Sequence, residues 1–396
     1  MRITPIDELN MRLDVLQELL QRHDICGVIL LQNSDLFYFT GSIQRGVLYI
    51  PAKGEPIYMV IKDFNRARLE SGLNQILKIT SVREFSEQLL KMGMKLPLRI
   101  GMEFDVIPVQ QFQRYQKLFS AAEIIDISPL VRQVRAIKSD YELGIMTECA
   151  LIANQTYEHA KTVICAGMTD LDVAAELECF SRKAGHQGII RFRSFNSELY
   201  FGHVFSGRDG AEATYLDAPL GGLGLSPAVG QGSGHKTIER GEPIIIDFII
   251  AYDGYLVDQT RTLSIGPLAD SLQQAYADML NIQEKLYAIA RPGVIWGDIY
   301  QQCYRLAEEL GYKDNFMGVT GSQVSFIGHG IGIEVDEIPF IARGFDQQPL
   351  EKNMTFAFEP KAVFSGIGAV GVENTWQVTT DGLKKITYAD EKLFQL

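Results

Sequence analysis

The chain has 396 residues, of which 46% are hydrophobic, and it carries a formal net charge of -12. That length exceeds one ordinary hydrophobic core and predicts two domains, with enough apolar residues to bury both. The acidic balance, with no basic cluster or basic helix, disfavours nucleic acid and anionic membranes as partners and favours small molecules or peptides.

Cysteine usage and the N-terminus indicate the compartment. The five cysteines are scattered, odd in number and free of C-x-x-C spacing, which argues against a disulfide framework and a cysteine-built zinc site. The N-terminus lacks a signal-peptide apolar core, and no run of about 18 apolar residues occurs. We therefore expect a cytoplasmic protein with no membrane partner.

The first third of the chain alternates between helical and strand patterns. Leucines at helical spacing predict a helix over 11–23, and a buried strand follows at 25–31. A hairpin and further helices and strands continue this alternation. We expect a mixed α/β domain over residues 1–130 and a second domain over residues 131–396.

The second domain contains two similar helical units. A long helix over 139–164 is opened by a capping box, and a second helix covers 169–185. The same pattern recurs over 271–290 and 293–311, and strands follow in each half. We interpret this as an internal pseudo-two-fold repeat, and two related halves usually build their site at the seam between them.

A glycine-rich stretch, residues 220–237, separates the halves. Its segment GQGSGHKT resembles a phosphate-binding loop, but His235 stands where that motif requires glycine, and no strand directly precedes it. We therefore interpret the stretch as a flexible loop that lines the site.

The most informative stretch is PIIIDFIIAYDGYLVDQTRT, residues 243–262. The dipeptide Asp253-Gly254 between two hydrophobic runs predicts a β-hairpin. A two-residue loop makes Asp258 the diagonal neighbour of Asp247, and a four-residue loop places the two directly opposite. Either register directs both carboxylates to one spot, where a metal ion would offset their charge, although each could instead be a structural residue with its own hydrogen bonds.

Three further polar residues interrupt hydrophobic segments later in the chain. His329 lies between glycines in SFIGHGIG, Glu359 ends the run MTFAFEP, and Glu373 lies within AVGVENTWQV. Taken alone, His329 would more often be a packed core residue. Together with Asp247 and Asp258, these residues form an oxygen-rich set with one imidazole, which suits Mn²⁺, Fe²⁺, Co²⁺ or Zn²⁺.

The order of these motifs resembles that of the pita-bread metallopeptidases, in particular the aminopeptidase P and prolidase branch. The matching motifs are D-x10-D-x-T-R-T, G-H-G-I-G, E-P and V-E. The segment VRAIKSDYEL resembles the start of their catalytic domain, and residues 1 to about 130 resemble their creatinase-type N-terminal domain. The resemblance thus covers nearly the whole chain.

The resemblance implies a homodimeric Xaa-Pro peptidase that uses a water activated by two divalent ions, with manganese favoured. Asp258 and Glu373 would bridge the ions, Asp247 would chelate one, and His329 with Glu359 would hold the other. Glu359 would also be the base that receives the proton of the water.

The chain departs from the family pattern at three positions. Asp336 stands where relatives carry a second histidine that contacts the substrate, and an aspartate could donate such a hydrogen bond only when protonated. Gly371 replaces an arginine, and the relatives' Pro-His aligns with Gly230. His203 or His235 could take the place of that last histidine, or either could be an ordinary loop residue.

These departures leave other functions open. The same fold and metals could act on a small non-peptide substrate, or the chain could be a non-catalytic binding protein. The intact ligand set counts against the last alternative, because a protein that only binds has no need of catalytic metal ligands.

Overall fold

The computed structural model of the protein describes residues 2–196 and 198–396. The chain divides into two compact units, one comprising Met1–Arg135 with Arg193–Asn196 and the other comprising Ala136–Phe192 with Ser197–Leu396. None of the described helices combines the length and the apolar character needed to cross a membrane.

The N-terminal unit is built on a six-stranded mixed sheet with the strand order β4-β3-β2-β1-β5-β6. Its strands are β1 (Gly27–Leu30), β2 (Gly46–Pro51), β3 (Ile57–Val60), β4 (Ile76–Lys78), β5 (Arg99–Met102) and β6 (Glu123–Asp126). Its helices are α1 (Ile6–Arg22), α2 (Asn33–Thr40), α3 (Phe64–Glu70), the 3-10 turn η1 (Val82–Glu84), α4 (Phe85–Lys91) and α5 (Val109–Leu118), and α6 (Ser128–Ala136) follows β6.

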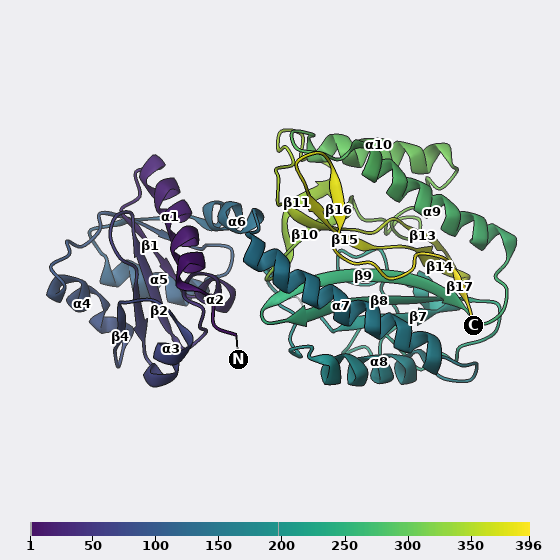
Figure 1. Ribbon diagram of the computed structural model, residues 1–396, viewed down its shortest axis with the longest axis horizontal. Coiled ribbons are helices and arrows are strands. Elements are labelled where there is room, and N and C mark those ends of the chain that lie inside the picture. Colours follow the sequence, from purple (N-terminus) through teal and green to yellow (C-terminus); the bar gives the residue numbers. More distant parts are fainter. Residues whose placement is uncertain (1, 197) are drawn as a thin grey trace. The chain divides into compact units, whose positions relative to one another are not determined.

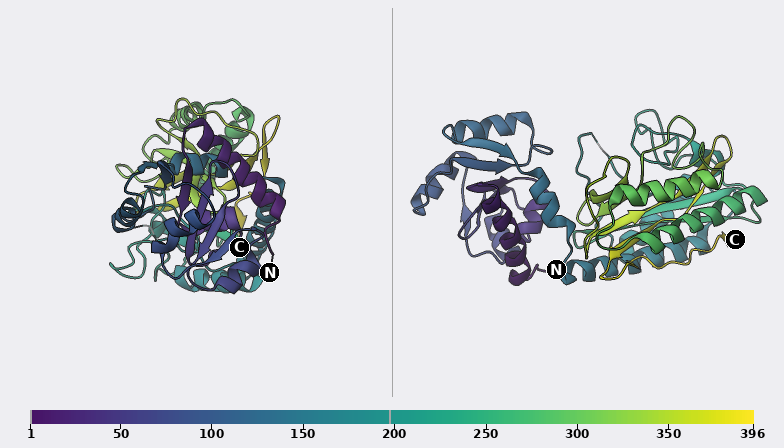
Figure 2. Two further views of the ribbon diagram at one scale, coloured as in Figure 1. Left: turned by 90° about the vertical axis from the view of Figure 1, so that its left-hand side faces the viewer. Right: turned by 90° about the horizontal axis from the view of Figure 1, so that it is seen from above.

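Helices cover both faces of this sheet because its central strands are apolar on both sides. On one face, Phe85 and Leu89 of α4 and Tyr115 of α5 pack into the core. Helix α1 buries its leucine stripe and contacts β2. In the left panel of Figure 2 the purple helix α1 lies on one side of the sheet and the blue helices lie on the other.

The C-terminal unit contains two pairs of helices. They are α7 (Asp140–Val163), α8 (Asp170–Ala184), α9 (Asp270–Ile289) and α10 (Trp296–Glu309). The capping box predicted at Ser139 is present, and a second one opens α8 at Thr169. Helices α7 and α8 pack on β7, β8 and β9, whereas α9 and α10 contact β11 and β14. Figure 1 shows the two pairs on opposite sides of the strands, which confirms the predicted repeat of helix pairs and strands.

The strands of this unit form two larger sheets and one hairpin. The four-stranded sheet, in the order β17-β9-β8-β7, contains β7 (Gly202–Ser206), β8 (Pro243–Tyr252), β9 (Tyr255–Ser264) and β17 (Phe394–Gln395). The five-stranded sheet, in the order β11-β10-β12-β15-β16, contains β10 (Phe326–Ile331), β11 (Val335–Ala342), β12 (Thr355–Phe358), β15 (Asn374–Val378) and β16 (Leu383–Lys385). The hairpin pairs β13 (Lys361–Phe364) with β14 (Gly368–Gly371), and a 3-10 turn η2 (Gly207–Ala211) follows β7.

Strand β9 joins the two larger sheets. The Thr375 hydroxyl receives a hydrogen bond from the backbone N–H of Asp258 at 2.8 Å and donates one to its carbonyl at 3.0 Å. The backbone N–H of Glu373 donates to the carbonyl of Thr260 at 3.1 Å. This seam between the halves is therefore held by direct hydrogen bonds, and it carries the polar residues singled out in the sequence.

Candidate metal centre

The β8–β9 hairpin sets the positions of the two aspartates. Tyr252 faces Tyr255, so Asp253-Gly254 is a two-residue loop, and both loop residues have positive φ, 45° and 90°. This backbone is the one that aspartate-glycine turns favour between twisted strands. Asp247 consequently faces Thr260, and Asp258 is its diagonal neighbour, in agreement with the two-residue register.

The structure brings all five predicted ligands to the seam. Asp247 lies on β8, Asp258 on β9 and His329 on β10, while Glu359 directly follows β12 and Glu373 lies between β14 and β15. All except Asp247, which is partly exposed, are buried. Four carboxyl groups and one imidazole thus face one buried space, an arrangement that requires cations.

One group within this cluster fits a single metal ion. His329 Nε2 lies 4.0 Å from Asp258 Oδ2, 3.8 Å from Glu359 Oε1 and 4.0 Å from Glu373 Oε1. Ligand atoms that share an ion at about 2.1 Å cannot be more than about 4.2 Å apart, and the three distances from His329 Nε2 satisfy that limit. The ligand atoms of Asp258, His329 and Glu373 all lie within 4.8 Å of one another. In addition, Asp258 Oδ1 is buried without a hydrogen-bond partner among the described residues. A metal ion bound to this oxygen would satisfy it.

The other half of the cluster is occupied by a side chain that the sequence analysis missed. The ammonium group of Lys361 donates to Asp247 Oδ2 at 2.9 Å, Glu359 Oε2 at 2.5 Å and Glu373 Oε2 at 3.3 Å. Lys361 is 1% exposed. A signal was available, because Lys361 follows Glu359 by two residues, and residues two apart in an extended segment share a face.

The charges around this ammonium shift several pKa values. Burial opposes the charge of Lys361, but the carboxylates of Asp247, Glu359 and Glu373 outweigh it and raise the lysine pKa. Burial is also the main reason why the pKa of Glu359 rises to about 7, against the effect of Lys361. Burial and then the neighbouring Glu373 raise the pKa of Asp258. The raised pKa values of Asp258 and Glu359 show that the buried carboxylates are costly to keep charged unless a cation lies between them.

His329 is oriented by the atoms behind it. Its Nδ1 lies 3.2 Å from the carbonyl of Gly330 and 3.4 Å from Asp336 Oδ1. Acceptors on this side favour a proton on Nδ1 and leave the Nε2 lone pair directed at the carboxylates, as is usual for metal-binding histidines. The structure thus places Asp336 against the imidazole of His329, on the side away from the other ligands.

His203 lies beside Asp247. The two residues face each other across β7 and β8, and burial lowers the pKa of His203 despite the nearby carboxylate. The glycine-rich stretch packs against one edge of this histidine, because a Cβ at Gly232 would lie 3.2 Å from its Nδ1. His235 and Gly230, by contrast, are exposed, and the neighbour of His235, Lys236, bonds to the start of α8 through its carbonyl.

Polar residues next to the ligands hold Glu373 in place. The Thr260 hydroxyl donates to Glu373 Oε2 at 2.6 Å. The guanidinium of Arg261 donates to the carbonyl of Glu373 at 2.7 Å and to Asn374 Oδ1 at 2.9 Å. Arg261 is buried, so these bonds act where water does not compete. The T-R-T motif therefore positions a ligand without supplying one.

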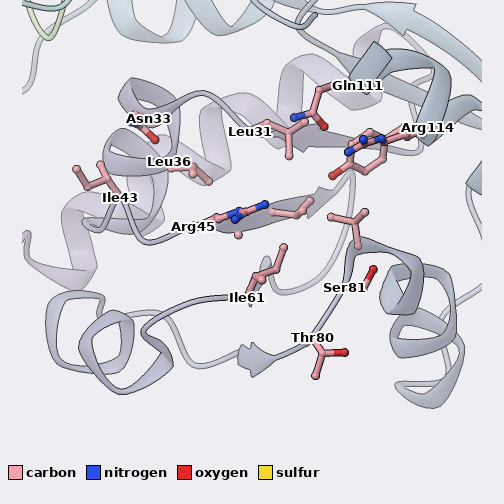
Figure 3. Close-up of a pocket in the computed structure, with 14 residues that line it drawn as sticks. Leu31, Asn33, Leu36, Ile43, Arg45, Ile61, Thr80, Ser81, Gln111 and Arg114 are labelled. Carbon is pink, nitrogen blue, oxygen red and sulfur yellow. The ribbon is translucent and has the colours of Figure 1, made fainter. Parts of the chain in front are cut away.

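The N-terminal unit contains a separate cavity of about 520 Å³. Its lining includes Arg45, Arg114 and Ser81, drawn as sticks in Figure 3. None of the predicted site residues lines this cavity, and all of them belong to the other unit. It is therefore not part of the metal centre.

Comparison with known proteins assigns both units to families. Residues 144–380 match metallopeptidase family M24, and residues 12–137 match the creatinase/prolidase N-terminal domain. The first match alone covers more than half of the chain and confirms the resemblance drawn from the order of the ligand motifs.

Relatives match over almost the full length. The chain is 25% identical over 391 residues to the Xaa-Pro dipeptidase of Pyrococcus horikoshii, which covers 98% of this chain and 100% of the relative. It is also 25% identical to an uncharacterized peptidase of Bacillus subtilis, with the same coverage.

Solved structures agree with this assignment. The Xaa-Pro dipeptidase from Bacillus anthracis superposes with a TM-score of 0.82 at 26% identity, covering 98% of this chain and 100% of that one. The prolidase from Pyrococcus horikoshii, 24% identical, has a TM-score of 0.80 and shares the fold. The chain is a member of metallopeptidase family M24, with a creatinase/prolidase N-terminal domain in front of a pita-bread catalytic domain.

Proposed function

We propose that the protein is a metal-dependent Xaa-Pro dipeptidase, which hydrolyses the bond between a residue and a following proline. One observation carries this proposal: the five predicted ligands converge in a chain that matches an Xaa-Pro dipeptidase from end to end. Membership of a metallopeptidase family implies a bound divalent ion. The oxygen-rich donor set makes Mn²⁺ our favoured choice.

The residues of the centre would have different roles in metal binding and proton transfer. Asp258, His329 and Glu373 would hold the ion, with Glu359 beside them. A bound divalent ion lowers the pKa of a water and polarises a carbonyl oxygen. Glu359 would be the base that accepts the proton of this water, because its Oε1 lies on the side of the cluster that would hold the ion.

His203 and Asp336 have different roles in this proposal. His203 is partly exposed beside Asp247, so it can present a hydrogen bond to a bound substrate. Asp336 acts through His329, because its carboxylate lies against the imidazole Nδ1. The family resemblance further predicts two ions per chain, a homodimer and a cytoplasmic location, and gel filtration with light scattering tests the dimer.

The direct test is proline release from Xaa-Pro dipeptides such as Leu-Pro and Met-Pro, with Leu-Ala and Pro-Leu as controls. Metal-stripped protein is compared before and after Mn²⁺ is added. We expect cleavage of the Xaa-Pro dipeptides alone, dependent on metal and abolished in Asp258→Asn, which removes one ligand charge at nearly constant shape. Bound metal without proline release would favour the alternative, a small non-peptide substrate.

A further inference from the structure

We propose that this centre holds a single divalent ion and that the ammonium group of Lys361 permanently fills the place of a second. The inference rests on the proposed function only in that both require an ion at Asp258, His329 and Glu373. It revises the two-ion expectation, which came from the family resemblance.

The hydrogen bonds of Lys361 allow its ammonium group to take the place of a metal ion. An ammonium group has three protons, and here each has a carboxylate acceptor, on Asp247, Glu359 and Glu373. These acceptors come from separate segments of the unit, so the ammonium ties them together as a metal ion would. No donor of the ammonium remains for another partner.

Lys361 and a metal ion cannot occupy this place together. An ion bound by the same three oxygens would lie about 2.1 Å from each, inside the space that Nζ fills at 2.5–3.3 Å from them. Two like charges at that separation would also repel strongly. Since Lys361 is buried, an ion could take this position only by displacing an ammonium group that has three carboxylate partners there.

The two glutamates divide their oxygens between the two cations. Glu359 and Glu373 each direct Oε1 at the His329 Nε2 side and Oε2 at Lys361 Nζ. They therefore bridge the metal position and the ammonium position. One divalent ion and one ammonium offset three of the four carboxylate charges and leave one negative charge.

Gly371 makes room for this lysine. The two residues face each other across β13 and β14, and a Cβ on Gly371 would lie 2.6 Å from Lys361 Cγ. A larger residue at position 371 would exclude the lysine stem from its present path. The Lys361 side chain on β13 can therefore take this path only because residue 371 on β14 is glycine.

Because the ammonium contacts ligands and is not itself placed against a substrate, Lys361 is a positioning residue, and metal content is the informative readout. Wild-type protein, Lys361→Ala and Lys361→Met are stripped, loaded with excess Mn²⁺, desalted and analysed for Mn per chain and by electron paramagnetic resonance. Lys352→Ala, at an exposed lysine of the same unit, is the matched control.

We expect one Mn²⁺ per chain and the spectrum of an isolated ion for the wild type, Lys352→Ala and Lys361→Met, whose stem still fills the space. Lys361→Ala should hold two ions with the spectrum of a coupled pair. A wild-type chain that retains two ions, or none, contradicts the proposal, as does an Lys361→Ala variant that stays at one. If the variants do not fold, the wild-type count alone decides.

Proline release separates this inference from the proposed function. One ion per chain without cleavage of any Xaa-Pro dipeptide would refute the proposed function and leave the single-ion centre intact. Two ions per chain together with cleavage would support the proposed function and refute the single-ion centre.

Discussion

Lys361 and Gly371 are partners across β13 and β14, and the lysine side chain fills the space in which a side chain at position 371 would lie. The ammonium of this lysine reaches Asp247, Glu359 and Glu373. The path of the lysine side chain therefore depends on the absence of a side chain at position 371.

A first prediction follows for Gly371→Ala. The new Cβ would meet Lys361 Cγ at 2.6 Å and the backbone carbonyl of Pro360 at 2.8 Å, so neighbouring atoms must move. We expect a loss of about 1–3 kcal/mol in the free energy of unfolding, measured in urea. Gly144→Ala in α7, where nothing lies within 4 Å of the added Cβ, is the control and should not destabilise.

The contact with Lys361 can be isolated by a double-mutant cycle. In Gly371→Ala/Lys361→Ala the clash with Cγ is absent and only the backbone contacts remain. The double variant should therefore lose less stability than the sum of the single variants by about 0.5 kcal/mol or more. Strict additivity would show that Lys361 does not occupy the space over Gly371.

A second prediction concerns Asp336→Asn. Asp336 has a positive φ of 62°, a conformation that asparagine also adopts, so the fold should be preserved. Loss of the carboxylate next to His329 Nδ1 should weaken Mn²⁺ binding about 10–100-fold, measured by competition with a chelator. Unchanged Mn²⁺ affinity combined with slower turnover would instead indicate that Asp336 contacts the substrate.

A third prediction concerns acid stability and His186. Burial is the main cause that lowers the pKa of this histidine from 6.5 to about 4. Its neutral ring stacks on Phe201, accepts from the N–H of Gly188 and lies 3.1 Å from the carbonyl of Ile249. Protonation therefore favours the unfolded chain, and the stabilisation is lost as the pH falls from 6.5 towards 4.

This loss should amount to about 3 kcal/mol in the free energy of unfolding, from the size of the pKa shift. His186→Gln keeps a donor and an acceptor but does not titrate, so its stability should fall less steeply over the same pH range. Urea unfolding at several pH values gives both curves. Parallel curves would mean that the His186 ring is not buried as a neutral group.

The sequence was sufficient for the parts that local rules govern. The Asp253-Gly254 turn predicted the hairpin that brings Asp247 and Asp258 together, and period-two alternation then placed both on one face. The capping box at Ser139 likewise predicted the start of α7. In each case neighbouring residues determine the structure, so the pattern can be read without knowledge of the fold.

The remaining features depend on pairings that local patterns do not specify. Register shifts between β10 and β11 bring Asp336 against His329, and such bulges have no reliable sequence signature. Lys361 begins a short strand, where a lysine is ordinarily solvated, and its burial follows from its pairing with Gly371. The spacing of Lys361 from Glu359 indicates a shared face, but the burial of its ammonium inside the ligand cluster is evident only from the fold.

We propose that this chain cleaves Xaa-Pro dipeptides with one metal ion beside Lys361. The most direct measurement is the rate of proline release from Leu-Pro while Mn²⁺ is titrated into metal-stripped protein of known concentration. We expect the rate to rise from zero and to level off at one Mn²⁺ per chain. A rate that stays at zero throughout, or that appears only with a second ion, would contradict it.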